Sequence, residues 1–140
     1  MTERVVRVGG GSGMWGDDLD APRRLVEGGP LDYLMLDFLA EVTMSVLQRQ
    51  KEKDPQQGWA RDIVGILEGV LPAIRDRGVR VLANAGGVNP HACAAAVRAM
   101  LERTGAAGRV RVAVVNGDDL LPRIDALISA GHALRHMETN

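Results

Sequence analysis

The sequence contains few aromatic residues, one cysteine, no long apolar run and almost no net charge. Aromatic residues make up 3% of the 140 residues, so any core must be built from aliphatic side chains. The single cysteine, Cys93, excludes an internal disulfide and fits a reducing cytoplasm. The net charge of −1 provides no basic surface for nucleic acid. No apolar run approaches the roughly 20 residues of a membrane span, and the first residues lack the apolar centre of a signal peptide. We therefore expect a soluble, cytoplasmic protein without a membrane or nucleic-acid partner.

The sequence does contain alternating strand and helix patterns, and its length favours a single domain over residues 1–140. Short apolar runs predict strands at 5–8, 31–39, 79–83 and 110–115. Helical spacing of apolar residues or helix-start signals predict helices at 22–27, 41–53, 63–75, 91–103 and about 120–130. Strands that alternate with helices pair in parallel through right-handed crossovers. We expect a three-layer α/β fold of the Rossmann-like type, in which helices flank a mainly parallel sheet of about four strands.

The stretch from Val79 to His91 predicts a strand, a glycine loop and the start of a helix. The strand stops at Asn84, and Gly86 and Gly87 allow the backbone to turn sharply or to approach a ligand closely. Asn89 followed by proline is a typical helix start, because asparagine caps free N–H groups and proline suits the first helical position. Ligands of parallel α/β proteins bind at such carboxyl ends of strands. We therefore predict that Asn84, Gly86, Gly87 and Asn89 bind substrate.

A second glycine-rich loop follows the first predicted strand, and residues 11–16 match the dinucleotide pattern G-x-G-x-x-G. Asp17 and Asp18 follow at once and would repel a diphosphate, whereas the pattern requires a helix to begin inside the glycines. Three interpretations remain: a loop that approaches an acyl or phosphate group, a tight turn without a ligand, or a dinucleotide-binding loop. In the first interpretation the substrate-binding residues are Gly11, Ser12, Gly13 and Trp15.

Three residues are candidate acid–base groups, each with a structural alternative. Asp37 interrupts an apolar strand near its end, so its carboxylate must be hydrogen-bonded, paired or facing a cavity. It either belongs to a site or caps the turn that follows. Glu41 lies in the first turn of a predicted helix, where it is either a stabilising charge or a site group. His91 is either an acid–base or ligand-binding residue beside the glycine loop or an exposed residue at a helix start.

Asp118 and Asp119 follow the last predicted strand. One of them can cap the next helix, which leaves the other without a structural explanation. Because parallel strands end at the same edge, we expect all these polar residues to gather at one rim of the sheet. Carboxylates and amides there could bind a divalent metal, through Asp118 and Asp119, or a substrate hydroxyl. The sequence has no Ser/His/Asp spacing, zinc pattern or Walker loop.

The sequence resembles the acyclic terpene utilisation AtuA-like family. The matching residues lie in order along nearly the whole chain, at 11–17, 36–45, 54–62, 84–93 and 117–121. Family members are longer, and the resemblance covers their N-terminal part. Asn116 stands where relatives tend to carry an acidic residue. The family is associated with the degradation of acyclic terpenes such as citronellol and geraniol, which proceeds through acyl-CoA thioesters.

The resemblance implies an acyl-CoA context. It also implies that a second polypeptide supplies the remaining part of the family's sequence, or that the chain is a stand-alone reduced form. A homo-oligomer could instead cover the open edges of a thin sheet. We expect an enzyme subunit that hydrates, dehydrates or cleaves a hydroxyacyl or enoyl thioester, with coenzyme A as the carrier of its small-molecule substrate. Asp37, Glu41 or His91 would be the catalytic residues. The alternatives are a structural or regulatory subunit that completes a partner's site, and a dinucleotide-binding module.

Overall fold

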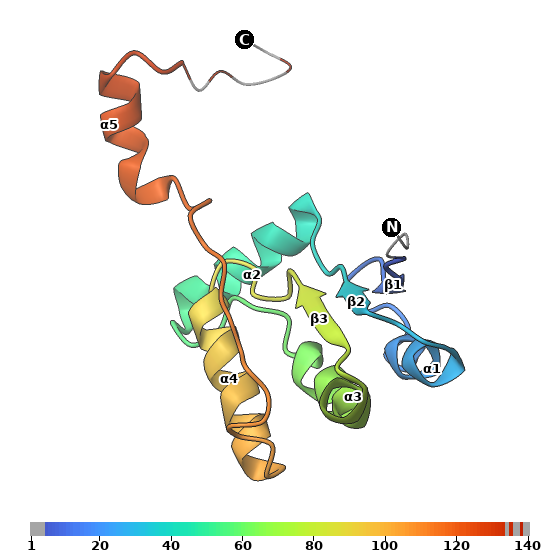
Figure 1. The fold of residues 1–140 in the computed structure, drawn as a ribbon. Coiled ribbons are helices and arrows are strands. Elements are labelled where there is room, and N and C mark those ends of the chain that lie inside the picture. The colour runs from blue at the N-terminus through green and yellow to red at the C-terminus, as the bar shows by residue number, and fades with distance from the viewer. Residues whose placement is uncertain (1–4, 134, 136–137, 139–140) are drawn as a thin grey trace.

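The computed structural model describes residues 5–133, 135 and 138 (Figure 1). The predicted start of the first strand falls within this range, whereas parts of the two ends of the chain lie outside it. No helix among the described residues combines the length and apolar character that crossing a bilayer requires. The elements are β1 (Val8–Ser12), α1 (Ala21–Gly28), β2 (Tyr33–Leu36), α2 (Glu41–Lys53), α3 (Asp62–Arg77), β3 (Arg80–Ala83), α4 (Pro90–Arg103), the 3₁₀ helix η1 (Leu121–Arg123) and α5 (Ile124–Ser129).

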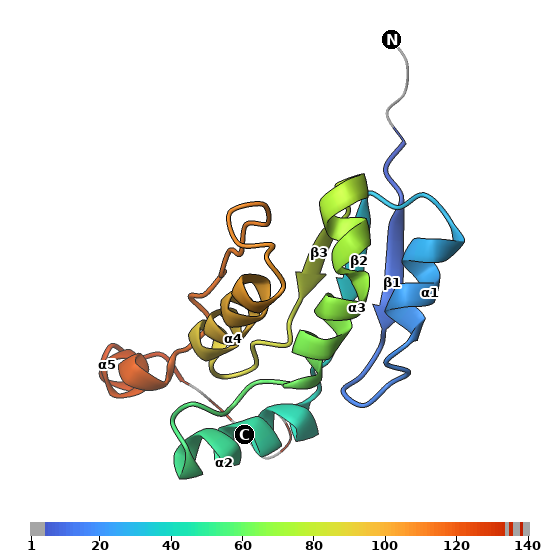
Figure 2. The same cartoon turned by 90° about the horizontal axis from the view of Figure 1, so that it is seen from below.

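The described residues form one parallel sheet with the strand order β1-β2-β3. Leu34 is opposite Gly9 on one side and Val81 on the other, which fixes the register across the three strands. Helices α1 and α3 lie side by side on the same face of the sheet, and α2 lies beyond the carboxyl ends of the strands (Figure 2). The α/β class and the parallel pairing predicted from the sequence are therefore confirmed.

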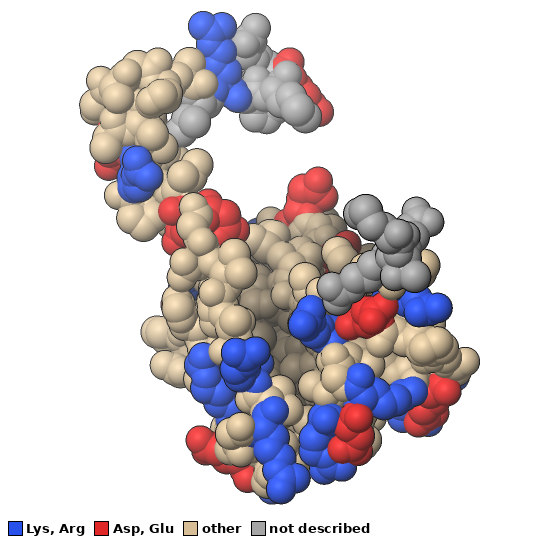
Figure 3. All heavy atoms as spheres, in the orientation of Figure 1, with Lys and Arg blue, Asp and Glu red and all other residues tan. Residues whose placement is uncertain are grey.

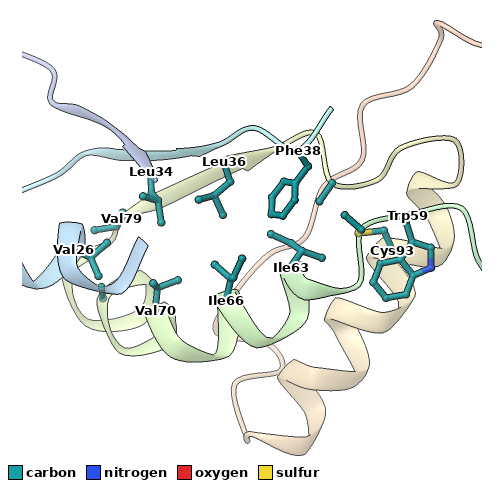
Figure 4. Packing of buried hydrophobic residues seen from close by; sticks show 13 residues of the cluster. Val26, Leu34, Leu36, Phe38, Trp59, Ile63, Ile66, Val70, Val79 and Cys93 are labelled. Atoms are coloured by element: carbon teal, nitrogen blue, oxygen red, sulfur yellow. The ribbon is translucent and has the colours of Figure 1, made fainter. Parts of the chain in front are cut away.

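The core lies between the sheet and the helices α1 and α3. Leu34 and Leu36 of β2 are at most 1% exposed, and their side chains point toward Ile66 and Val70 of α3 (Figure 4). Val26 of α1 closes one end of this layer, and Trp59 and Cys93 lie at the other. Burying an aliphatic side chain of this size contributes about 1.5–3 kcal/mol. Aliphatic residues thus supply most of the core, as the low aromatic content predicts.

Within residues 5–133, no helix covers the opposite face of the sheet, and we call it the bare face. It carries Val8, Met35 and Leu82, whose exposed fractions are 61%, 52% and 50%. These side chains alternate with the buried ones because successive residues of a strand point to opposite faces. Right-handed crossovers in the order β1-β2-β3 bring successive helices to the same side. The predicted third layer is therefore wrong for the described residues.

The predicted fourth strand at 110–115 is also wrong, because these residues form no strand. Val110 and Val112 instead pack against a second apolar cluster between α3 and α4, centred on Met100 and Leu101. The guanidinium of Arg98 donates to the carbonyl of Val112 at 3.4 Å. The segment therefore packs on α4 and does not extend the sheet. Neither four strands nor a Rossmann-like assignment is confirmed.

Strand β1 begins later than predicted and contains the first glycines of the loop. A Cβ atom on Gly11 would lie 2.8 Å from Cδ2 of Leu36 and 3.3 Å from Cα of Pro22. Gly11 thus permits α1 to approach the sheet closely. By contrast, a Cβ atom on the neighbouring Gly10 meets nothing within 4 Å, because Gly10 faces the uncovered side.

The predicted helix ends are largely confirmed. Asn89 caps α4 by accepting a hydrogen bond from the backbone N–H of Ala92 at 3.4 Å, and Pro90 occupies the first helical position. Gly78 ends α3 in the left-handed region, with a φ of 69°. Pro72 lies within a single continuous helical segment. The ends of these two helices therefore coincide with the capping residues, and Pro72 marks no helix end.

The difference between Gly10 and Gly11 gives a stability test. We expect Gly11→Ala to lower the free energy of unfolding by about 1–3 kcal/mol, because the new methyl group overlaps Leu36 and the backbone of Pro22. The matched control Gly10→Ala should be neutral or slightly stabilising, since its methyl group enters open space. Urea unfolding followed by circular dichroism measures both. Equal effects of the two variants would contradict the close packing of α1.

Candidate functional site

The carboxyl ends of the three strands are joined by side-chain hydrogen bonds. The amide nitrogen of Asn84, after β3, donates to Oδ1 of Asp37, after β2, at 2.7 Å. The side-chain oxygen of Asn84 accepts from the backbone N–H of Phe38, also at 2.7 Å. Ser12, at the end of β1, donates its hydroxyl to the carbonyl of Asp37 at 3.0 Å. Three predicted site residues from three strands therefore meet at this edge.

The Asp37 carboxylate is stabilised in its charged form. Its pKa lies below the usual range, first because the Asn84 amide donates to it and second because the backbone N–H of Leu39 does so at 3.2 Å. Both hydrogen bonds go to Oδ1, so Oδ2 is the oxygen through which Asp37 can meet a ligand. The same donors reduce the basicity of the carboxylate. This geometry favours a fixed negative charge that accepts hydrogen bonds over a strong proton acceptor.

The glycine loop at 11–16 binds a carboxylate of its own chain. The N–H of Gly13 donates to Asp17 at 3.0 Å, and the N–H of Asp18 donates to it at 2.8 Å. These bonds lower the pKa of Asp17, so an anion already occupies the donors of the loop. The next helix, α1, begins only at Ala21. The loop therefore lacks the helix N-terminus that a pyrophosphate would require, which disfavours the dinucleotide interpretation.

Trp15 ties this loop to the helical layer. Its indole nitrogen donates to the carboxylate of Asp62, in the first turn of α3, at 3.0 Å. The side chain is half-buried against the main core. Its polar atom is thus satisfied inside the chain. The exposed part of the loop includes Gly13, whose N–H is already bonded to Asp17.

Gly86 and Gly87 have structural reasons to be glycine. A Cβ atom on Gly86 would lie 2.9 Å from the backbone of Pro90. Gly87 has a φ of +51°, and a Cβ atom there would overlap Cδ1 of Leu47 in α2. The N–H of Gly87 already donates to the carbonyl of Asn84 at 3.1 Å. The pair therefore shapes the loop beneath α2, and this N–H is not free to stabilise an oxyanion.

Asn89 likewise has its side chain engaged at both ends. Besides capping α4, it donates its amide to the carbonyls of Pro55 and Gln57, both at 2.8 Å. Lys51 reaches the same region and donates to the carbonyl of Val88 at 2.7 Å. No local sequence pattern marks this long-range contact. These bonds hold the α2–α3 connection against the glycine loop.

His91 and Glu41 are both exposed at this edge of the structure. His91 lies in the first turn of α4, and its Nε2 atom is 3.0 Å from the amide nitrogen of Asn116. When the amide donates, Nε2 is the acceptor and Nδ1 carries the hydrogen. Glu41 begins α2, where its backbone carbonyl accepts the hydroxyl of Ser45 at 3.1 Å. The contact with Asn116 fixes the orientation of the imidazole ring. The Glu41 carboxylate lies at the start of a helix, as predicted.

Among the described residues, the two aspartates of the predicted metal site share no hydrogen-bond partner with Asp37. Asp119 accepts a hydrogen bond from the N–H of Leu121, the first residue of η1, at 3.0 Å, but the cap position itself is held by Leu120, not by either aspartate. Asp118 is exposed. The described part of the chain contains no group of three or more His, Cys, Asp or Glu side chains placed to hold a metal ion. Any cation would therefore need ligands beyond these two carboxylates.

Two hollows in the surface lie away from the rim. One is at the amino ends of β2 and β3, where Tyr33 and Arg80 contribute to its lining. The other lies between α1 and α3 and is lined in part by Leu19 and Ile66. The candidate site is thus defined by the hydrogen-bonded strand ends and by His91, with Asn116 as its neighbour.

The Asp37–Asn84 bond predicts a measurable titration. We expect the Asp37 pKa to be depressed in the native protein and to rise toward the ordinary aspartate value in Asn84→Ala, because the amide donor is lost. Because the native pKa is lowered, ionised Asp37 stabilises the fold above the unfolded-state pKa. This stabilisation is lost as the pH falls through the native pKa. Carboxyl-carbon NMR measures the pKa directly.

Asp76 is an internal control for this titration. Its pKa is lowered chiefly by Arg75, its neighbour in α3, and should not change in Asn84→Ala. We also expect Asn84→Ala to cost about 1–2 kcal/mol of stability, because the N–H of Phe38 loses its acceptor. An unchanged Asp37 pKa in the variant would contradict the hydrogen-bond assignment.

Comparison with known proteins identifies the family. No curated protein and no solved structure matches the chain significantly. The sequence profile of the family described as acyclic terpene utilisation family protein AtuA matches residues 6–140. The match covers β1 to α5 and so includes every residue of the candidate site. The chain belongs to the acyclic terpene utilisation AtuA family.

Proposed function

We propose that this chain is an enzyme subunit that acts on a hydroxyacyl or enoyl thioester, by hydration, dehydration or carbon–carbon cleavage. The observation that carries the proposal is the ionised Asp37 held by Asn84 where three parallel strands end. Core packing does not require a carboxylate there. Membership in a family of acyclic terpene utilisation supports a thioester substrate, because such acyl chains are commonly activated on coenzyme A.

In this proposal Asp37 binds the substrate and His91 transfers the proton. Oδ2 of Asp37 accepts a hydrogen bond from the substrate hydroxyl or from the water to be added. The imidazole of His91 is the acid–base group, since histidine is the side chain most often used for that step. Asn116 orients the ring through its contact with Nε2. Glu41, exposed at the start of α2, is the alternative acid–base group.

The second candidate is a non-catalytic subunit whose strand ends complete a partner's site. One observation favours it: Trp15, Gly87 and Asn89 already use their donors within the chain. These residues would then serve to maintain the shape of a loop that another chain contacts. The two candidates differ in one property, because only the first allows the isolated chain to be active.

Turnover measurements separate the candidates. We expect purified protein, alone or with its co-purified partner, to interconvert 3-hydroxyacyl-CoA and enoyl-CoA, or to cleave the former. His91→Gln should lower kcat by roughly 100-fold or more, as loss of an acid–base group does. Asp37→Asn and Asn84→Ala should each lower kcat/KM by at least about tenfold, which corresponds to about 1.4 kcal/mol of lost transition-state stabilisation. Ultraviolet absorbance of the enoyl thioester follows the reaction.

Asp76→Asn is the matched control, because Asp76 is an exposed carboxylate in α3 whose partner is the adjacent Arg75. It should retain the rate of the native protein. Wild-type rates in both Asp37→Asn and Asn84→Ala, with circular dichroism showing intact folding, would remove the catalytic assignment. Activity that requires the partner and is unchanged in His91→Gln, Asp37→Asn and Asn84→Ala would favour the non-catalytic subunit.

A further inference from the structure

The C-terminal part of the chain, residues 115–131, stands away from the rest of the molecule, and we call it the arm (Figure 1). It contains η1 and α5, which contact each other, and neither helix has a buried residue. Its large apolar side chains are exposed: Val115 by 95%, Leu121 by 67% and Ile128 by 57%. A helix of six residues is not stable in water without packing. The arm therefore needs a surface to cover its apolar side.

The bare face of the sheet needs a covering of the same kind. Met35 and Leu82 are neighbours across β2 and β3, and Val8 lies one strand further on the same side. Parallel sheets are normally buried on both faces, and contiguous exposed apolar patches mark interaction sites. Helices α1 and α3 lie on one side of the sheet, whereas the arm stands out on the other (Figure 1).

Several contacts keep the arm off its own sheet. Its base is fastened to α4 by the contact between Asn116 and His91, next to the bond from Arg98 to the carbonyl of Val112. Figure 3 shows open space between the arm and the body, with acidic side chains where the arm leaves the body. The arm carries three aspartates, Asp118, Asp119 and Asp125, against one arginine, Arg123, whereas the bare face carries Arg80 of β3. The two surfaces are thus complementary in charge as well as apolar.

We propose that two copies of this chain associate reciprocally, with the arm of each copy packed on the bare face of the other. In a twofold dimer each copy contributes one arm and one bare face. Both arms and both bare faces are then covered. The reciprocal exchange also doubles the area buried by one arm, which brings the contact toward the size of a stable interface. The covering layer absent from the single chain is then supplied by the second copy.

Cross-linking between differently labelled copies tests the exchange. Leu121→Cys is placed in one preparation and Met35→Cys in another, and the two are mixed, co-refolded and treated with a short bis-maleimide. The native Cys93 does not compete, because it is buried and burial raises its pKa to about 11. We expect a cross-linked species of twice the chain mass in the mixture. Replacing Met35→Cys by Arg75→Cys, on the helical side, should give none.

Sedimentation equilibrium provides the second measurement. We expect Leu121→Asp and Met35→Asp each to raise the dissociation constant of the dimer at least roughly 100-fold, because a charge enters an apolar contact twice per dimer. Leu19→Asp, an equally exposed apolar site near α1, should leave it unchanged. Both variant sites are exposed in the single chain, so folding should persist.

Three results would overturn the proposal. The first is a monomer at all concentrations. The second is a dimer indifferent to Leu121→Asp and Met35→Asp. The third is a chain carrying both Leu121→Cys and Met35→Cys that cross-links only within itself, because the arm then covers its own sheet.

Discussion

The side chain of Asn84 connects the sheet to the candidate site. Its oxygen accepts from the backbone of Phe38 and its nitrogen donates to Asp37, so one amide fixes both the direction of the chain after β2 and the charge of the carboxylate. Because β2 is the central strand, this bond also sets where Ser12 of β1 can reach the carbonyl of Asp37. A shorter or apolar residue at position 84 would release all three contacts. The geometry of the rim therefore depends on a single residue at a strand end.

The second determinant is a core built on one side of the sheet. Leu34 and Leu36 are buried under α1 and α3, while Met35 between them is half exposed. The fold is thus held by an aliphatic layer between sheet and helices, and Gly11 lets α1 pack closely against it. Helix α2 adds a further restraint, since Leu47 packs over the positive-φ Gly87. This packing positions the loop before α4, and with it His91.

The sequence predicted those features that depend on local chemistry. The cap at Asn89, the helix from Glu41 to Lys53 and the end of α3 at Gly78 follow from residues adjacent in the chain. The meeting of Asp37 with Asn84 followed from the rule that parallel strands end at one edge. The roles of the site residues remain predictions. Contacts such as Lys51 with Val88, and Trp15 with Asp62, join distant segments and left no mark in the pattern.

The main failure, at Val110 to Val115, has a physical cause. Valine at alternate positions predicts a strand, but the pattern does not specify what its side chains pack against. Here the inward valines find an apolar cluster on α4, and a strand at the β3 edge would have had one face uncovered, like the rest of the sheet. The same limitation led to the prediction of a third layer. The pattern of apolar and polar residues determines which face of a strand or helix is apolar. It does not determine which segment of the chain, or which second copy, covers that face.

We propose that the hydrogen-bonded ends of β2 and β3 bind the substrate. The most direct measurement is an NMR titration of the labelled protein with a 3-hydroxyacyl-CoA, which follows the side-chain amide of Asn84 and the N–H of Phe38. We expect saturable shifts of both signals and of His91, while signals from the amino ends of the strands, such as Arg80, stay in place. Shifts confined to other surfaces, or no shift at saturating thioester, would contradict it.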